Sequence, residues 1–211
     1  DDNIDGGAGD DTVYASNGAD VLDGGTGSDT IDYSIGAEDM TIDLSHGLGY
    51  YTSYPAGADN FSNFENAVGG SANDTLIGSD VDNILTGGAG NDTIWGDEGN
   101  DALYGDAGND NLNGGSGDDF LTGGLGADRM RGESGLDTFV FIRGEAQGDT
   151  ILDFEGAGVV GGDKIEFRGY GAGASVHQVS GDSWQIDAAG ISETFKIAGV
   201  TNLAKVDFYF T

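Results

Sequence analysis

A nine-residue unit repeats along most of this chain, and it constrains the fold more than any other feature. Eleven near-complete copies share one register, at residues 6–32 and again at 69–140. The sixth position is Asp in every copy except one, where it is Asn83. The eighth position is a large apolar residue, from Val13 to Phe139. Such a period is typical of a solenoid, in which each unit contacts only its neighbours.

The two parts of the nonapeptide have different physical roles. The first six residues are rich in glycine, which permits tight turns with positive φ angles that expose backbone carbonyls around the sixth-position carboxylate. The last three residues suit a very short strand with one inward side chain, the eighth. Two nonapeptides then form one coil, and stacked coils form two parallel sheets around a thin apolar interior. We therefore predict an all-β chain with a parallel β-roll at residues 1–140.

Composition indicates what completes this fold. The chain has 41 glycines among 211 residues and a formal net charge of −31. Backbone entropy and carboxylate repulsion both oppose folding, and a hard divalent cation held by oxygen would offset them. Facing turns of successive coils would form an oxygen cage suited to Ca²⁺, whereas Zn²⁺ is disfavoured because the chain has two His and no Cys.

The same composition excludes other classes of protein. Seven Lys and Arg residues cannot neutralise a phosphate backbone, so nucleic acid is not an expected partner. No apolar run approaches the roughly 20 residues that span a bilayer, so no transmembrane segment is expected. His46 and His177 lie in no nucleophile or metal motif, and no catalytic residue is assigned.

The repeats GGAGNDTIW (87–95) and GGSGDDFLT (114–122) resemble the RTX (repeats-in-toxin, hemolysin-type) nonapeptide, GGxGxDxUx with U a large apolar residue. This resemblance implies a β-roll that binds several Ca²⁺ ions between turns two repeats apart. Two copies depart from this pattern: repeat 78–86 has Asn83 at its sixth position, and ASNGADVLD (15–23) lacks the leading glycines. We therefore expect weaker or empty sites at the turns of these two copies. The implied ligands are sixth-position side chains together with first- and third-position carbonyls: Gly6, Ala8, Asp11, Asp20, Gly24, Thr26, Asp29, Gly69, Ser71, Asp74, Asn83, Gly87, Ala89, Asp92, Gly96, Glu98, Asp101, Gly105, Ala107, Asp110, Gly114, Ser116, Asp119, Gly123, Leu125, Asp128 and Asp137.

Residues 33–68 interrupt the nonapeptide, but the repeats resume in phase at Asp74. The segment NFENAVGGSANDTL (63–76) resembles the one by which serralysin-type metalloproteases and mannuronan C5-epimerases re-enter their repeats. We expect residues 33–68 to form wider coils that continue the roll. In an alternative interpretation, the tyrosines of this segment, Tyr50, Tyr51 and Tyr54, stack on sugar.

The repeat ends near residue 140, and residues 141–211 are predicted to form an antiparallel β cap. DTILDF (149–154) and DKIEF (163–167) resemble the C-terminal block of serralysin-type proteases, which implies Ca²⁺ ligands at Asp149, Asp153 and Asp163 that share a cation. The alternating segment 175–187 predicts a hairpin that turns at 180–182, and 193–200 and 205–210 predict further strands. Such a cap protects the open end of a solenoid from edge-to-edge pairing.

The last residues, Asp207, Phe208, Tyr209 and Phe210, resemble the C-terminal signal of proteins exported by type I secretion. Together with the RTX resemblance, they imply a secreted, extracellular bacterial protein, monomeric, with the type I secretion machinery as a partner. DDNID (1–5) resembles the tail of an earlier repeat, so we expect a segment before it. The predicted function is that of a calcium-binding C-terminal module that folds on Ca²⁺ after secretion and stabilises a larger parent protein.

Two alternatives from other functional classes stay open. The chain could be a polysaccharide-binding accessory module of an extracellular lyase or epimerase, with Arg129, Arg131 and Arg143 as its basic cluster. It could also be an adhesin segment that contacts a cell surface, which large exposed apolar areas would favour.

Overall fold

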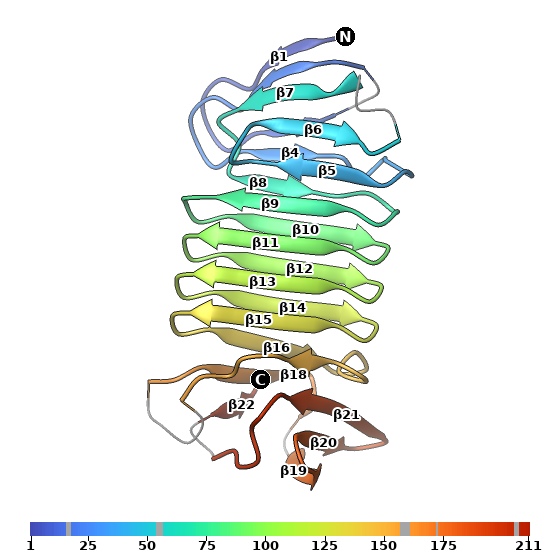
Figure 1. Cartoon of the computed structure of the whole chain (residues 1–211), viewed down its shortest axis with the longest axis vertical. Coiled ribbons are helices and arrows are strands. Elements are labelled where there is room, and N and C mark those ends of the chain that lie inside the picture. Colours follow the sequence, from blue (N-terminus) through green and yellow to red (C-terminus); the bar gives the residue numbers. More distant parts are fainter. Residues whose placement is uncertain (16–17, 54–56, 157–160, 172, 205–206) are drawn as a thin grey trace.

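The computed structural model describes residues 1–15, 18–53, 57–156, 161–171, 173–204 and 207–211. The molecule is an elongated stack of strands that lie across its long axis (Figure 1). Within these described ranges, the strands form two sheets, one of 13 and one of 9 strands, in which most neighbours are parallel. The chain is therefore an all-β parallel roll, as predicted. Within the described ranges, no helix has the length and apolar character needed to cross a membrane.

Residues 69–140 form the regular part of the roll, and their strands alternate between the two sheets. Partners within a sheet lie two repeats apart, so that Ile94 is in register with Leu76 on one side and Leu112 on the other. The inner strands are six residues long because each continues into the first three positions of the next nonapeptide. The 13-stranded sheet contains β9 (Thr75–Ser79), β11 (Thr93–Glu98), β13 (Asn111–Ser116) and β15 (Arg129–Ser134), and the 9-stranded sheet contains β10 (Ile84–Ala89), β12 (Ala102–Ala107), β14 (Phe120–Leu125) and β16 (Thr138–Ile142).

The core of the roll is only one side chain deep per strand. The eighth-position side chains point inward and are completely buried, and full burial of an aliphatic side chain of this size contributes roughly 1.5–3 kcal/mol. The thin core contains Leu76, Leu85, Ile94, Leu103, Leu112, Leu121, Met130 and Phe139. Because the repeats at 69–140 have no second apolar layer, hydrogen bonds of the backbone and interactions at the turns must contribute the rest of the stability.

The N-terminal part departs from the regular roll at residues 33–68. In the 13-stranded sheet, β6 runs antiparallel to both β5 and β7, so the structure differs here from the wider parallel coils that were expected. The reversal between β5 and β6 uses Gly47, whose φ is 63°, and the Gly47 carbonyl accepts a hydrogen bond from Phe61 N–H. The strands are β1 (Asn3–Asp5), β2 (Thr12–Tyr14), β3 (Val21–Asp23), β4 (Thr30–Asp32), β5 (Met40–Asp43), β6 (Leu48–Tyr51), β7 (Asp59–Ser62) and β8 (Asn66–Val68).

The C-terminal residues close the other end of the stack. β17 (Thr150–Ile151) and β18 (Lys164–Arg168) extend the two sheets in parallel, and β22 (Phe208–Phe210) pairs parallel with β18. β19 (Ser175–Ser180), β20 (Ser183–Ala188) and β21 (Ile191–Ile197) are antiparallel, and the β19–β20 hairpin turns at Gly181, as predicted. Residues 205 and 206 of the predicted last strand lie outside the described residues.

An aromatic cluster fills this end of the core. Phe141, Phe167 and Phe195 are buried and in mutual ring contact, and Phe208 and Phe210 pack against Phe167 with ring centroids 6.1 and 5.4 Å away. The core of the cap is therefore built from packed aromatic rings, whereas that of the repeats is built mostly from aliphatic side chains.

Candidate calcium sites along the two rows of turns

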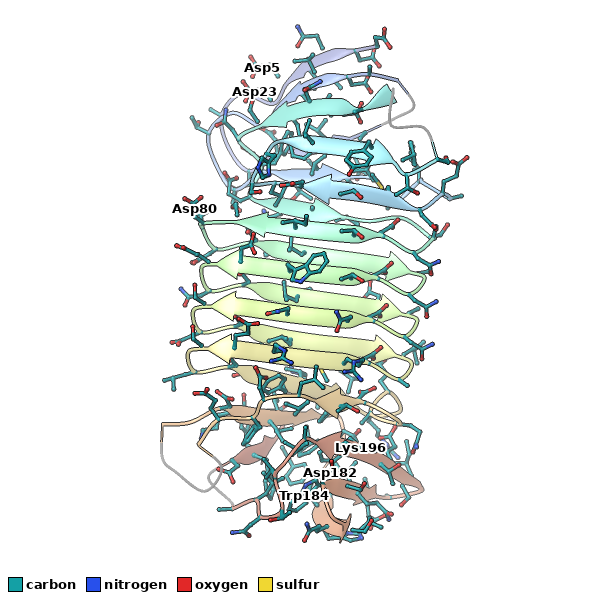
Figure 2. All side chains as sticks on the ribbon, viewed as in Figure 1. Asp5, Asp23, Asp80, Asp182, Trp184 and Lys196 are labelled. Atoms are coloured by element: carbon teal, nitrogen blue, oxygen red, sulfur yellow. The ribbon has the colours of Figure 1, made fainter. Side chains whose placement is uncertain are left out.

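The turns form two rows, one along each edge of the roll, and carboxylates follow both edges (Figure 2). In Figure 2, Asp5, Asp23 and Asp80 mark the second row. The rows are defined by their sixth-position residues, and outside the nonapeptides the residue at the same place in the turn is also called a sixth position. The first turn row holds Asp20, Asp59, Asp74, Asp92, Asp110, Asp128 and Asp149, and the second turn row holds Asp11, Asp29, Glu65, Asn83, Asp101, Asp119, Asp137 and Asp163.

A ladder of hydrogen bonds joins the sixth positions within each row. The backbone N–H of Asp92 donates to Oδ1 of Asp110 at 2.8 Å, and the N–H of Asp101 donates to Oδ1 of Asp119 at 2.8 Å. The same bond recurs from coil to coil through most of both rows. The structure thus brings together turns that are two repeats apart in the sequence, and one carboxylate oxygen of each Asp is used to hold the stack.

The second carboxylate oxygen is buried and has no partner at eight sixth positions. In the described part of the chain, no group donates a hydrogen bond to these Oδ2 atoms. A buried polar atom without a partner costs about 1–3 kcal/mol, and more when it is charged. The eight residues are Asp11, Asp29, Asp92, Asp101, Asp110, Asp119, Asp128 and Asp137.

Burial also makes ionisation unfavourable for the six of these carboxylates from Asp92 to Asp137. Removal from water raises the pKa of Asp92 and Asp119 to about 6, and that of Asp101 and Asp110 to about 7. The negative charges of neighbouring carboxylates in the same row raise the pKa further. A cation placed among these oxygens would reverse both effects, because it favours the charged carboxylate.

Backbone carbonyls approach the unpartnered oxygens at the first position of the repeat. Oδ2 of Asp101 and the carbonyl oxygen of Gly114 both lie within 3 Å of the point where a Cβ of Gly96 would stand. Gly105 has the same surroundings, with Asp110 Oδ2 and Gly123 O. The first position is glycine because a side chain would fill this space.

The third-position carbonyls have a different role. The carbonyl oxygens of Thr26, Ala107, Ser116 and Leu125 each accept a backbone hydrogen bond from the fourth-position glycine of the preceding coil in the same row. A carbonyl oxygen has two lone pairs, so this bond leaves one free for a cation. The third position therefore helps to stack the coils.

These donors fit Ca²⁺. Ca²⁺ prefers six to eight oxygen ligands at about 2.3–2.6 Å, and carboxylates and backbone carbonyls are the usual donors. The described residues contain no cluster of three or more His, Cys, Asp or Glu side chains that could hold a metal, so the carbonyls are essential to each site. The eight carboxylates with unpartnered Oδ2 atoms, together with the first-position carbonyls, are the residues that would hold the ions.

Several sixth positions predicted as ligands have protein partners instead. Oδ2 of Asp74 accepts a hydrogen bond from Gly70 N–H at 2.6 Å, and Oδ2 of Asp163 accepts one from Glu155 N–H at 2.7 Å. Oδ1 of Asn83 accepts from Ser79 N–H at 2.7 Å. The protein thus already satisfies the second carboxylate oxygen of Asp74 and Asp163 and the single side-chain oxygen of Asn83.

The prediction that Asp149, Asp153 and Asp163 share one cation is wrong. Asp149 accepts from Asp128 N–H in the first turn row, whereas Asp163 accepts from Asp137 N–H in the second. Asp149 does not converge with the other two because β17 and β18 extend different sheets, and each delivers its preceding Asp to a different edge. Asp153 lies close enough to Asp163 for its charge to contribute to the raised pKa of Asp163, of which burial is the largest cause. Burial, with the charge of Asp128 as a smaller cause, raises the pKa of Asp149 to about 8.

Asp153 instead binds the backbone of the neighbouring coil. Its two carboxylate oxygens accept hydrogen bonds from the N–H groups of Gly132 and Glu133, each at 3.0 Å. The guanidinium of Arg131 lies 3.9 Å away. Asp153 therefore holds the last repeat against the segment that follows β17.

A second ladder, at the fifth position, was not predicted from the sequence. The N–H of Asn109 donates to Oδ1 of Asn91 at 2.8 Å, and Ala127 N–H donates to Oδ1 of Asn109 at 2.9 Å. This outer ladder runs in the direction opposite to the sixth-position ladder. The recurrence of Asn or Asp before the sixth-position Asp, as in GND and GDD, was the available signal.

The groups proposed for polysaccharide binding do not form one surface. Arg129 and Arg131 lie on β15 in the 13-stranded sheet, whereas Arg143 follows β16 of the 9-stranded sheet and donates to the carbonyl of Ala189 at 2.5 Å. Tyr50 and Tyr51 are partly buried in β6, and Tyr54 lies outside the described residues.

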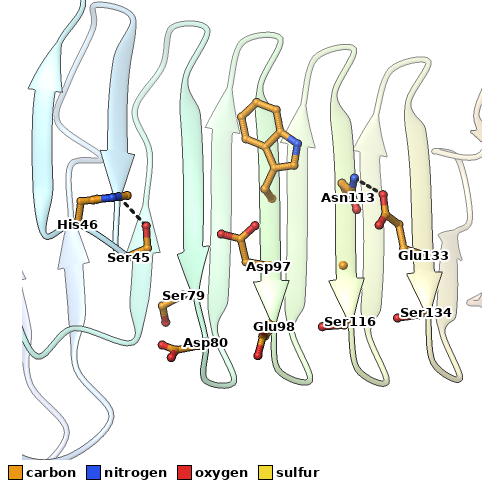
Figure 3. A pocket seen from close by; sticks show the side chains of 12 residues that line it. Ser45, His46, Ser79, Asp80, Asp97, Glu98, Asn113, Ser116, Glu133 and Ser134 are labelled. Carbon is orange, nitrogen blue, oxygen red and sulfur yellow. Dashed lines mark hydrogen bonds between the residues drawn. The ribbon is translucent and has the colours of Figure 1, made fainter.

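A shallow groove of about 640 Å³ crosses the outer face of the 13-stranded sheet (Figure 3). Trp95 lines the groove, and Asn113 donates a hydrogen bond to Glu133 at one side of it. Asp97 and Glu98 also line the groove, and His46 stands at its N-terminal end. These carboxylates would repel an acidic polysaccharide.

Comparison with known proteins agrees with this geometry. The family model of the RTX calcium-binding nonapeptide repeat (4 copies) matches residues 1–31, 68–103 and 104–139. No curated protein matches the chain. Among solved structures, the chain is similar to the extracellular lipase LipA from Serratia marcescens, with 16% identity and a TM-score of 0.34 over 100% of this chain and 38% of the lipase.

The chain is also similar to the AlgE6R3 subunit of the Azotobacter vinelandii mannuronan C5-epimerase, with 24% identity and a TM-score of 0.32 over 66% of this chain and 78% of that one. The chain spans less than two thirds of the lipase. The family match and the repeated oxygen-lined turns lead to one conclusion: residues 1–31 and 68–139 of this chain are RTX calcium-binding nonapeptide repeats.

Proposed function

We propose that this chain is a calcium-dependent folding module of a larger secreted bacterial protein, and that it folds after export through a type I secretion system. The observation that supports this proposal is the set of eight buried Oδ2 atoms without a partner. Folding without a cation would bury these carboxylates beside one another, whereas bound Ca²⁺ supplies the missing positive charge.

The energetic balance favours a switch. The core is one side chain deep, and the glycine-rich turns lose much backbone entropy on folding. An ion that binds only the folded state stabilises it by RT ln(1 + [Ca²⁺]/Kd), about 2.7 kcal/mol per site at a hundredfold excess. Several such sites on one roll make folding steep in calcium. A compartment with little free Ca²⁺ would therefore keep the chain unfolded.

The C-terminal residues support the proposed order of export and folding. Phe208 and Phe210, in the segment that resembles an export signal, pack in β22 against Phe167, and Asp207 is fully buried. A transporter that recognises these side chains would have to bind them before β22 pairs with β18. Export would then precede folding, and pairing in the calcium-rich exterior would prevent return.

A calcium titration of chelator-treated protein, followed by far-UV circular dichroism, tests the proposal. We expect a cooperative coil-to-β transition at millimolar or lower Ca²⁺. Mg²⁺ at the same concentration is the control and should not reproduce the transition, because it requires a tighter octahedral site and retains its waters. A full β spectrum in excess chelator would contradict the proposed switch.

A further inference from the structure

The unpartnered carboxylate oxygens are not spread evenly along the chain. Asp11 and Asp29 form a first group, and the six sixth positions from Asp92 to Asp137 form a second, uninterrupted group. Between them lie three sixth positions whose side chains are buried and paired with the protein: Asp59, Asp74 and Asn83. The seam, defined as residues 33–83, contains all three.

At Asp59, a tyrosine hydroxyl replaces the cation. Oδ1 accepts from Asp20 N–H at 2.8 Å, as in the rest of the ladder, but Oδ2 accepts from the hydroxyl of Tyr33 at 2.7 Å. Tyr33 is itself fully buried, and burial together with the charge of Asp59 raises its pKa, so the hydroxyl remains a donor. Both oxygens of Asp59 are therefore occupied.

At Asp74, two backbone donors have the same effect. Oδ1 accepts from Met40 N–H at 3.0 Å, and Oδ2 accepts from Gly70 N–H at 2.6 Å. Met40 begins β5, which belongs to the hairpin inserted between the N-terminal coils and β9. The N–H of Met40 thus replaces the sixth-position N–H of the preceding coil, which is the donor to Oδ1 in the regular ladder.

At Asn83, an amide stands where the repeat has a carboxylate. Its Oδ1 and the carbonyl of Gly96 lie within 3 Å of the point where a Cβ of Gly78 would stand, the same arrangement as that of Asp101 with Gly114. The Nδ2 of Asn83 donates to the carbonyl of Glu65 at 2.6 Å. A carbonyl of the preceding coil is therefore held by an amide donor.

The sixth-position ladder is also interrupted in the seam. In the second turn row, the regular bond continues from Asp29 N–H to Oε2 of Glu65 at 2.9 Å, but the next link is reversed, because Nδ2 of Asn83 donates to the carbonyl of Glu65. In the first turn row, β6 and β5 separate β7 from β9. In neither row, therefore, does an unbroken series of carboxylate-to-backbone hydrogen bonds connect the two groups of sites.

We propose that the seam is a metal-free boundary that divides the roll into two calcium-binding blocks, residues 1–32 and 84–140, which fill independently. This proposal rests on the proposed calcium-binding function. Tyr33, Met40, Ile42 and Phe61 are buried in the seam as part of the core that runs through the roll, so the packing of the seam does not depend on ions at its turns. Asn83 and Asp74 close the two turns of the regular repeats that would otherwise extend the second block.

Hydrogen exchange of the full chain, measured by mass spectrometry during a Ca²⁺ titration, tests the boundary. The matched variants are Asp29→Asn and Asp110→Asn, because Asn keeps an oxygen that can accept the ladder hydrogen bond and removes only the charge. We expect Asp110→Asn to raise the Ca²⁺ midpoint of protection for residues 84–140 at least severalfold and to leave that of residues 1–32 unchanged. Asp29→Asn should do the reverse.

The outcomes separate this inference from the proposed function. Equal shifts of both midpoints in either variant would show a single block and overturn the inference, while calcium binding itself would stand. Hydrogen-exchange protection of the wild-type chain that does not change with Ca²⁺ would overturn both the two-block inference and the proposed function. Asn83→Asp provides an independent readout: equilibrium dialysis should find one additional Ca²⁺ per chain, and an unchanged number would refute the role assigned to Asn83.

Discussion

The N–H of Asp92 donates a 2.8 Å hydrogen bond to Oδ1 of Asp110, while Oδ2 of Asp110 is buried without a partner. One side chain thus holds two coils together and offers a free oxygen to a cation. Ion binding and coil stacking are coupled because the same carboxylate performs both, and the coupling repeats at every site from Asp92 to Asp137.

Removal of one of these charges should weaken the stabilisation by calcium. In saturating Ca²⁺, Asp119→Asn should lower the free energy of unfolding by about 2–3 kcal/mol, the contribution of one site at a hundredfold excess of ligand. The loss should shrink as Ca²⁺ is lowered towards the folding midpoint, because less of the wild-type stability then comes from the ion. Urea unfolding at a series of Ca²⁺ concentrations above the midpoint measures this difference. A loss that is the same at every Ca²⁺ concentration would show that Asp119 acts only through the ladder.

Neighbouring residues of β10 test the thin core. Leu85→Ala should cost about 2–5 kcal/mol, because Leu85 is fully buried and the truncation leaves a cavity. Ile84→Ala, one residue earlier, is the matched control and should cost less than about 1 kcal/mol, since Ile84 is 51% exposed. Thermal or urea unfolding in Ca²⁺ measures the free energy of unfolding of both variants. Similar losses of stability in the two would contradict a core formed by the eighth-position side chains.

The fourth-position glycines should be the least tolerant of substitution. Gly117 has a φ of 138°, and a Cβ there would overlap the carbonyl oxygen of Gly99 in the preceding coil. Gly117→Ala should therefore disrupt the stack and reduce calcium-induced circular dichroism. Gly181→Ala is the control, because its φ of 55° adds only about 1–2 kcal/mol of strain and no atom lies within 4 Å. Equal tolerance would contradict the close approach of the coils.

The outer ladder should stabilise the roll without involving ions. Asn109→Ala removes the acceptor for Ala127 N–H and should cost about 1 kcal/mol at every Ca²⁺ concentration that keeps the roll folded. Asn109→Asp keeps the acceptor, as Asp118 does in the other row, and should retain most of the stability. Calcium affinity measured by calorimetry should change little in either variant. A large loss of affinity would place the fifth position in the ion site.

Protection of the C-terminus should depend on calcium. In Ca²⁺, carboxypeptidase should remove residues 207–211 slowly, because Phe210 packs on Phe167 and β22 pairs with β18. In chelator, the same segment should be digested rapidly. Phe167→Ala should restore digestion in Ca²⁺ while the calcium-induced β signal of the repeats remains. Rapid digestion of the wild-type chain in Ca²⁺ would contradict a sealed terminus.

Much of this protein follows from the repeat alone. The nine-residue period places an inward side chain at the eighth position and an acid at the sixth, and stacking of such units predicts two parallel sheets, a thin core and two rows of oxygen-rich turns. These features are local and periodic, so each copy of the repeat specifies them again. The hairpin at Gly181 was predictable for the same reason, because turn residues and alternation are local signals.

Only the tertiary structure decided which acids are candidate ion ligands. Asp74 and Asp92 look alike in the sequence, but the donors Gly70 and Met40 satisfy Asp74, whereas Oδ2 of Asp92 has no partner. The placement of Asp149 and Asp163 on opposite edges likewise depends on which sheet each following strand joins. Carboxylates are chemically identical along the chain, and the groups that surround them after folding determine whether a cation is required.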